Sequence, residues 1–337
     1  MAWIGLDIGG ANLKAAFPGA LDCPAMEMPF PMWTDWQMLE EAIAKLVRHA
    51  SAADSIAVTM TGELADCFEN RREGMLYIAD AVERVCTNRR IVYYSCDGVW
   101  RSRKETEDVW DLVAAANWHA TATWGARLLP DRSGVVVDIG STTTDVSLVK
   151  DGVVVTGSQN DLQRLTTGEL LYVGADRTPI CGLLNHVQYG QQRIALANEL
   201  FATVGDAAIW KGLAPELPDS MQTADGRPKT RVSSGQRMAR MLCRDLDDLE
   251  SDLIDALADQ TIAAAETAIG DAISKRLANA KVARALLAGE GQFLACEVIK
   301  AISSDIEVVF LADEIGEMAS ACGPAHAVAV LASEYFA

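Results

Sequence analysis

The tripeptide Asp-Ile-Gly occurs twice in this chain, each time directly after a short apolar run. Asp7-Ile8-Gly9 follows residues 2–6, and Asp138-Ile139-Gly140 follows Val135–Val137, 131 positions later. Short aliphatic runs of this kind are typical of buried strands, and a glycine accommodates the tight turn after each. The spacing is well above the roughly 20–50 residues of solenoid repeats. The repeat therefore predicts two copies of a whole domain, whose turns face each other across a cleft.

The second copy belongs to a stretch that predicts three consecutive strands, residues 135–137, 145–149 and 153–156. Asp151-Gly152 is typical of a type I′ hairpin turn between the last two. Four hydroxyl residues, Ser141 to Thr144, follow Gly140. A strand that ends in a carboxylate and continues into N–H and hydroxyl donors can hold a phosphate beside a divalent cation. An ordinary hairpin with a threonine-rich turn is the alternative.

Two further strands end in candidate ligand-binding residues. The run Ser55–Met60 is followed by Glu63 and Asp66, and the run Val282–Ala288 is followed by Gly289-Glu290-Gly291. Ligands of α/β domains bind at the carboxyl ends of the strands, and two glycines let a flat ligand approach bare backbone. An acidic pair at a helix N-terminus is the alternative for Glu63 and Asp66.

Charge limits the partners that the chain can bind. Its net charge is −18 over 337 residues, which opposes binding to nucleic acid and to anionic membranes. No apolar run approaches the roughly 18 residues of a membrane helix, so we expect a soluble, cytoplasmic protein. A phosphorylated small-molecule substrate must then be held by local N–H donors and Mg²⁺. A homo-oligomer is compatible with the sequence.

The three glycine-bearing turns resemble the two phosphate segments and the adenosine segment of the actin, Hsp70 and sugar kinase superfamily. This resemblance implies an α/β fold of two ribonuclease-H-like domains, with a ligand cleft between them that holds a nucleotide and Mg²⁺. It implies an N-terminal domain at 1–130, joined by a C-terminal helix at 315–337, and a second domain at 131–314 with a helical insertion. Residues 111–126 and 315–331 match the two connecting helices of that superfamily.

A narrower resemblance rests on six dispersed segments, which are GLDIGGANLKAA, MTGELADCF, AAANWHATA, VVDIGSTTTDVSLV, TTGELLYVGADRTPICGL and TADGRP. Together they resemble the hydantoinase A and oxoprolinase-like family. They resemble still more closely its short members in tetrahydromethanopterin-linked one-carbon metabolism, which include archaeal synthases of the methanofuran pathway. The implied reaction transfers an aminomethylfuranmethyl group from its diphosphate to the phenol of γ-glutamyltyramine and releases diphosphate. The alternatives are an ATP-dependent kinase or ATPase, a hydantoinase- or oxoprolinase-like hydrolase, and a nucleotide-binding regulatory protein.

The resemblance also implies roles for individual residues. Asp7 and Asp138 would hold Mg²⁺, and Asp145 or Glu63 would accept the phenol proton. Arg177 or Arg227 would bind the γ-glutamyl carboxylates, with a surface position as the alternative for both. The implied phosphate or nucleotide site, with ATP as a possible cofactor, comprises Asp7, Gly9, Gly10, Asn12, Lys14, Asp138, Gly140, Ser141, Thr142, Thr143, Thr144, Gly289, Glu290 and Gly291. For Lys14, a solvent-facing strand position is the alternative.

Overall fold

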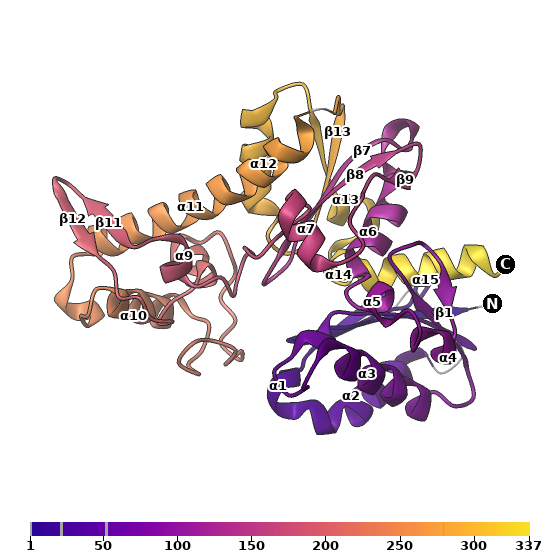
Figure 1. Ribbon diagram of the computed structural model, residues 1–337. Helices are drawn as coiled ribbons and strands as arrows, with labels where there is room; N and C mark the ends of the chain where they lie inside the picture. The colour runs from indigo at the N-terminus through magenta and orange to yellow at the C-terminus, as the bar shows by residue number, and fades with distance from the viewer. Residues whose placement is uncertain (1, 21–22, 51–52, 279) are drawn as a thin grey trace.

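The computed structural model describes residues 2–20, 23–50, 53–278 and 280–337, which form two lobes, each built on its own sheet (Figure 1). The sheet of the N-terminal lobe has the strand order β3-β2-β1-β4-β5-β6. Its strands are β1 (Trp3–Ile8), β2 (Asn12–Ala16), β3 (Ala25–Pro29), β4 (Ser55–Met60), β5 (Arg90–Tyr94) and β6 (Trp100–Arg101). β1, β2 and β3 form an antiparallel meander, and β4 and β5 continue parallel to β1.

The sheet of the C-terminal lobe repeats this plan, with the order β10-β8-β7-β13-β14 and β9 paired with β8. Its strands are β7 (Gly134–Ile139), β8 (Thr144–Lys150), β9 (Val153–Val154), β10 (Leu170–Leu171), β13 (Arg284–Ala288) and β14 (Glu307–Phe310). β7 and β8 are antiparallel, whereas β13 and β14 run parallel to β7. Asp151 and Gly152 both have positive φ, at 52° and 81°, as the predicted type I′ turn requires.

Helices cover the outer face of each sheet. The N-terminal lobe has α1 (Met32–Asp35), α2 (Leu39–Val47), α3 (Arg71–Val85), α4 (Arg103–Thr106) and α5 (Trp110–Val113). The C-terminal lobe has α7 (Asp161–Thr167), α12 (Gln292–Ile302) and an insertion, which contains α8 (Ile180–Leu183), β11 (His186–Tyr189), β12 (Gln192–Ala195), α9 (Val204–Lys211), α10 (Arg231–Met241) and α11 (Ser251–Leu277). α11 is long, but no helix in the described ranges is both long and apolar enough to cross a membrane.

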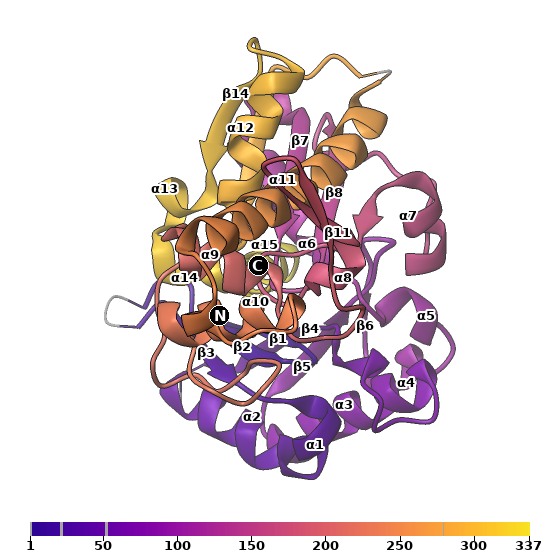
Figure 2. The same cartoon turned by 90° about the vertical axis from the view of Figure 1, so that its left-hand side faces the viewer.

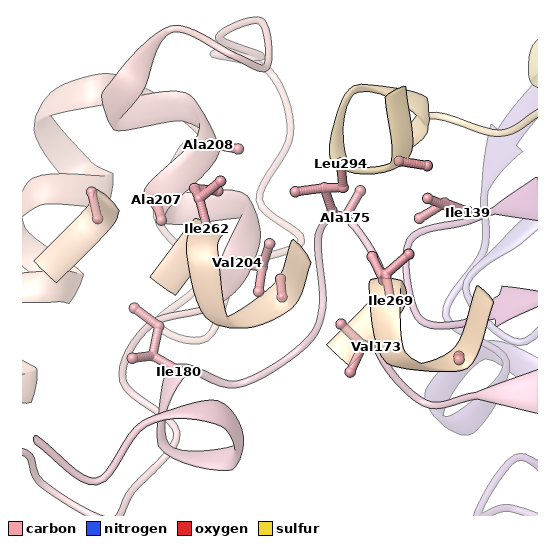
Figure 3. Close-up of a cluster of buried hydrophobic side chains, with 14 of the residues drawn as sticks. Ile139, Val173, Ala175, Ile180, Val204, Ala207, Ala208, Ile262, Ile269 and Leu294 are labelled. Atoms are coloured by element: carbon pink, nitrogen blue, oxygen red, sulfur yellow. The ribbon is translucent and has the colours of Figure 1, made fainter. Parts of the chain in front are cut away.

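The insertion is tied to the C-terminal sheet by one continuous apolar core. Ile139, at the end of β7, lies near Ala175 and Leu294, and the same cluster extends along α11 through Ile269 and Ile262 (Figure 3). Within the insertion, this cluster also includes residues of α9 and α10. From the side, α10 and its adjoining loops lie in front of the N-terminal lobe (Figure 2). The insertion is therefore anchored at the strand end that bears the second Asp-Ile-Gly turn.

Two helices lie between the sheets, α6 (Asn117–Gly125) and α15 (Gly323–Tyr335). α15 packs on β1 and β4, α6 packs on β7 and β8, and the two helices contact each other. Their buried side chains join residues of both sheets in a single apolar cluster, which includes Ala57 and Leu286. The last helix of the chain therefore completes the N-terminal lobe; the domain limits 1–130 and 131–314 stay a prediction.

The two predicted connecting helices are interrupted, which corrects the continuous helices at 111–126 and 315–337. The first is broken between α5 and α6, where Ala115 has a φ of 52°. The span of the second contains the last residue of α13 (Leu311–Ile315), then α14 (Glu317–Ala321) and α15. Gly316, with a φ of 84°, separates the first two, and Pro324 lies in the first turn of α15. Proline is favoured in a first turn because no intrahelical N–H bond is lost there.

Gly5 permits the close approach of α15 to β1. A Cβ atom on Gly5 would lie 1.7 Å from the carbonyl oxygen of Ala325 and 3.0 Å from Cβ of Ala329. We expect Gly5→Ala to lower the free energy of unfolding by about 3 kcal/mol or more, because a backbone atom cannot move aside as a side chain can. Chemical denaturation measures this difference. The matched control is Gly157→Ala, whose Cβ meets no atom within 4 Å; an equal loss in both variants would contradict the prediction.

Candidate functional site

The two Asp-Ile-Gly turns have the same hydrogen-bond pattern. The N–H of Gly9 donates to the carbonyl of Asn12 at 3.1 Å, and the N–H of Gly140 donates to that of Thr143 at 2.9 Å. Each turn is therefore closed by a hydrogen bond between residues three positions apart. The strand residues that flank each turn also correspond. Asp7 lies opposite Lys14 in the register of β1 and β2, and Asp138 lies opposite Asp145 in that of β7 and β8. The repeat read from the sequence is thus a repeat of backbone geometry.

The first turn is held in place by hydrogen bonds from the segment that follows β3. The carbonyls of Gly10 and Ala11 accept the N–H groups of Met32 and Phe30, at 2.9 and 2.8 Å. The N–H groups of Gly10 and Ala11 themselves have no acceptor among the described residues. These two donors, rather than the N–H of Gly9, are available to a ligand.

The second turn is held in the same way by residues 175–177. The carbonyl of Gly140 accepts the N–H of Ala175, and that of Ser141 accepts the N–H groups of Asp176 and Arg177 at 3.1 and 2.8 Å. No acceptor for the N–H groups of residues 141–143 is present in the described part of the chain. The N–H of Gly140 is occupied by the turn, so the donors of this loop are those of Ser141 and the two threonines after it.

Both turns line one cleft of about 940 Å³ between the lobes. Of the residues predicted for the site, those in the lining are Asp7, Gly9, Gly10, Asn12, Lys14, Glu63, Asp138, Gly140, Ser141, Thr142, Thr143, Asp145, Arg177, Gly289 and Glu290. Three predicted residues are not in it, namely Thr144, Gly291 and Arg227. The lining residues absent from the prediction include Glu27, Trp33, Thr61, Leu64, Asn117, Asp161, Arg164, Leu170, Tyr172 and Gln292.

Thr144 and the third glycine turn support the second loop. The hydroxyl of Thr144 is buried and donates to the carbonyl of Val173 at 2.7 Å. A Cβ on Gly289 would lie 2.3 Å from the carbonyl oxygen of Ile139, and one on Gly291 would lie 2.3 Å from Cγ2 of the same residue. Both glycines therefore let the turn pack on the end of β7. Glu290 lines the cleft.

Of the two repeated aspartates, Asp7 is buried and Asp138 is half-buried. Oδ1 of Asp7 has no hydrogen-bond partner among the described residues. Burial raises the pKa of this carboxyl from 3.8 to about 6, although Lys14 opposes the rise. Burial, followed by the charge of Asp145, raises the pKa of Asp138 to about 7. A desolvated carboxylate is stabilised when a cation approaches it. The pair therefore forms a site where a positive charge is favoured.

These carboxylates supply the oxygen ligands that Mg²⁺ prefers. In proteins, Mg²⁺ is commonly bound by one or two carboxylates together with water and phosphate oxygens. No group of three or more His, Cys, Asp or Glu residues in the described ranges is placed to hold a metal by itself. The residues present therefore fit a cation that is shared with a bound phosphate group.

Lys14 lies inside the cleft rather than in solvent. Its ammonium donates to the carbonyl of Ala321 in α14 at 2.8 Å and lies 3.5 Å from a carboxylate oxygen of Glu27. Burial lowers the pKa of Lys14, but Glu27 and Asp7 outweigh that effect, so the pKa is raised. Lys14 thus remains a cation near the first turn.

A chain of alternating charges crosses the cleft from Glu63. Arg71 Nη2 donates to Glu63 Oε1 at 2.9 Å and to Asp161 Oδ2, in the other lobe, at 3.1 Å. Glu63 is 2% exposed, and its second oxygen, Oε2, has no hydrogen-bond partner in the part of the chain that the structure describes. Burial raises the pKa of Glu63, and Arg71 opposes the rise. Glu63 therefore presents a buried, unpaired oxygen on a side chain held in place by Arg71.

Asp145, the other candidate base, is paired more tightly. Arg164 Nη2 donates to Asp145 Oδ1 at 2.5 Å, and its Nη1 contacts Asp161 Oδ1 at 3.4 Å. The Arg164 guanidinium is fully buried and lies 4.0 Å from the ring centroid of Trp118. Burial raises the pKa of Asp145 despite this arginine. Removal of the Asp145 charge would leave a buried arginine without its closest partner, which favours a structural role for Asp145.

The two predicted substrate arginines lie in different places. Arg177 lines the cleft, and its guanidinium carbon lies 4.7 Å from the ring centroid of Trp33 on the opposite lobe. Arg227 belongs to the loop between α9 and α10, where it donates to Gln236 and lies outside the cleft lining. Asp225 of that loop accepts from Arg237 and Arg240. The TADGRP segment is therefore held within the insertion by ion pairs.

Comparison with known proteins identifies relatives that match most of this chain. The profile of the hydantoinase/oxoprolinase family matches residues 54–333. A Methanocaldococcus jannaschii protein named (4-{4-[2-(gamma-L-glutamylamino)ethyl]phenoxymethyl}furan-2-yl)methanamine synthase is 30% identical over 97% of this chain and 96% of its own. A protein of the same name from Methanococcus vannielii is 36% identical over 36% of this chain and 54% of its own.

Among solved structures, a ROK family glucokinase from Streptomyces griseus, in complex with glucose and AMPPNP, aligns over 99% of this chain and 100% of its own. The TM-score is 0.51 at 13% identity, which shows the fold alone. The predicted two-lobed α/β fold of the actin, Hsp70 and sugar kinase type is thereby confirmed. Since the family profile spans most of both lobes and one relative aligns almost end to end, the chain belongs to the hydantoinase/oxoprolinase family.

Proposed function

We propose that this protein is an enzyme that forms an aryl ether, by transferring an aminomethylfuranmethyl group from its diphosphate to the phenol of γ-glutamyltyramine. The observation that carries the proposal is the pair of turns whose N–H groups have no acceptor among the described residues. They lie beside the carboxylates of Asp7 and Asp138, in a cleft large enough for a diphosphate. The name of the M. jannaschii relative describes a compound in which a phenol oxygen is linked to a furan through a methylene group.

In this reaction, the phenol oxygen forms a bond to the furanylmethyl carbon while the bond from that carbon to the diphosphate oxygen breaks. The electron pair of the broken bond leaves with diphosphate. The N–H groups of Gly10, Ala11 and residues 141–143 donate to the departing oxygens, and this interaction strengthens as charge develops on them. Asp7 and Asp138 would hold Mg²⁺, which when bound neutralises charge on the diphosphate.

The phenol, with an ordinary pKa of ~10, must lose its proton during the transfer. Glu63 Oε2 is buried, unpaired and in the cleft lining, so it is the acceptor that we assign. Arg71 acts through Glu63 by holding its other oxygen, and is a positioning residue. The proton moves from the phenol oxygen to Oε2 as the ether bond forms.

A second function, transfer of phosphate from ATP, is favoured by one observation. The fold is that of a sugar kinase, and the Gly289-Glu290 backbone reaches the same cleft as the two turns. ATP, rather than a substrate diphosphate, would then occupy the N–H loops.

Incubation of the purified protein with the furan diphosphate, γ-glutamyltyramine and Mg²⁺ tests both functions. We expect the ether and free diphosphate in equal amounts, measured by mass spectrometry and phosphate analysis, with no requirement for ATP. A reaction without γ-glutamyltyramine is the control and should yield no ether. The absence of ether, together with ADP formation when ATP is supplied, would overturn the proposal in favour of the kinase or ATPase.

A further inference from the structure

The mouth of the cleft differs in chemistry from its interior. Three large side chains with apolar surface line the cleft and yet are exposed, namely Trp33 at 40%, Leu64 at 54% and Tyr172 at 51%. Trp33 and Leu64 belong to the N-terminal lobe, and Tyr172 follows β10 in the C-terminal lobe. The interior is lined instead by carboxylates and N–H groups. Aromatic side chains exposed in a cleft provide a surface on which a planar ligand can stack.

Arg177 adds an unpaired positive charge to this surface. Among the described residues, three cationic side chains line the cleft, and two of them, Lys14 and Arg164, form ion pairs with carboxylates. Arg177 forms no ion pair with any described residue, and its guanidinium lies over the Trp33 ring. Stacking on an aromatic face leaves the N–H groups at the edge of a guanidinium free to donate. These donors match a carboxylate.

We propose that Trp33, Leu64, Tyr172 and Arg177 form a binding subsite for an aryl compound that bears a carboxylate. The ring packs between Trp33 and Tyr172, and the carboxylate accepts hydrogen bonds from Arg177. This inference rests on the proposed function, in which the acceptor is a phenol with a γ-glutamyl group. Leu64 directly follows Glu63 in the chain, and both line the cleft. The subsite therefore adjoins the assigned proton acceptor.

The subsite predicts how binding depends on each half of the ligand. Wild-type protein should bind γ-glutamyltyramine more tightly than N-acetyltyramine, which has the same phenol and no carboxylate. Arg177→Gln should weaken binding of γ-glutamyltyramine about tenfold or more and leave that of N-acetyltyramine unchanged, because a charge-assisted hydrogen bond is lost. Trp33→Leu should weaken binding of both ligands by a similar factor, since the stacking surface is common to them.

Isothermal titration with each compound, and with diphosphate plus Mg²⁺, measures these differences. Arg227→Gln is the matched control, because this arginine lies outside the cleft lining and its loss should change neither affinity. Diphosphate binding should be the same in all three variants, which shows that the interior is intact. Equal affinity of wild type and Arg177→Gln for γ-glutamyltyramine, or no binding of that compound to wild type, would overturn the subsite.

The outcome is separable from that of the proposed function. Ether formation by an Arg177→Gln variant with unaltered acceptor affinity would refute the subsite and leave the synthase reaction standing. Carboxylate-selective aryl binding without ether formation would refute the reaction and leave the subsite. Stronger binding of adenosine than of either phenol would assign the aromatic surface to a nucleotide base and overturn the inference.

Discussion

Replacement of Asp138 by asparagine is expected to weaken Mg²⁺-dependent binding of diphosphate about a hundredfold or more. Changes in residues that merely support a metal ligand often reduce metal affinity 10–100-fold, and the loss of a ligand itself should have a larger effect. Asparagine has nearly the same shape, so the fold should persist. Isothermal titration with diphosphate, in the presence and absence of Mg²⁺, measures the effect.

A matched control for this variant is Asp66→Asn, which removes an exposed carboxylate from the same cleft. Its Mg²⁺-dependent affinity should stay close to that of wild type. Unchanged affinity in Asp138→Asn, with circular dichroism like that of wild type, would rule out Asp138 as a metal ligand.

The stability of the metal-free protein should depend on pH through the carboxyls of Asp7 and Asp138. The raised pKa values, about 6 for Asp7 and about 7 for Asp138, mean that the folded protein binds these protons more tightly than the unfolded chain does. The metal-free protein should therefore lose stability as pH rises from about 4 to about 7. Mg²⁺ with diphosphate should raise the melting temperature more at pH 8 than at pH 5, because the ionised carboxylates bind the cation. Asp138→Asn should flatten this slope.

Replacement of Glu63 by glutamine is expected to reduce the rate of ether formation about 10²–10⁴-fold, the usual range for loss of a general base. The glutamine carbonyl can still accept from Arg71, so the side chain keeps its position but cannot accept a proton. Diphosphate binding should be unchanged, because Glu63 belongs to neither N–H loop. Single-turnover rates, followed by mass spectrometry, measure the loss.

The pH profile distinguishes this role from a structural one. The wild-type rate should rise with pH through the raised pKa of Glu63, and this limb should be absent in Glu63→Gln. Asp145→Asn is the comparison, and it should reduce stability because Arg164 stays buried beside a neutral group. A wild-type rate in Glu63→Gln, together with loss of the pH-dependent limb in a folded Asp145→Asn, would transfer the role of base to Asp145.

Much of the interior of the cleft could be predicted from local sequence. The strands β1 and β7, the turns at their ends and the carboxylates that precede the turns all follow from runs of a few residues. The closing bonds, Gly9 to Asn12 and Gly140 to Thr143, join residues three positions apart. The equivalence of the two turns is therefore visible in the sequence as a repeat. The sequence does not show that the N–H groups of Gly9 and Gly140 are used within the turns.

The contacts across the cleft could not be predicted in this way. Arg71 meets Asp161 from 90 positions away, and Arg177 lies over Trp33 from the opposite lobe. The sequence around Arg177 does not distinguish it from Arg227, which lies outside the cleft lining. Sequence alone therefore makes these two arginines equivalent candidates. The interruptions of the connecting helices were also hidden, because Ala115 has a residue type that favours continuous helix.

Local sequence thus decided the phosphate turns and their carboxylates, because the hydrogen bonds of a tight turn and the alternation of a strand involve neighbours in the chain. The tertiary structure alone decided which carboxylate keeps an unpaired oxygen, which arginine reaches the cleft and which aromatic residues line its mouth. Each of these depends on the packing of α6 and α15 between the two sheets, which sets how the lobes face each other. Long-range packing, unlike turn geometry, leaves no signature in a short segment of sequence.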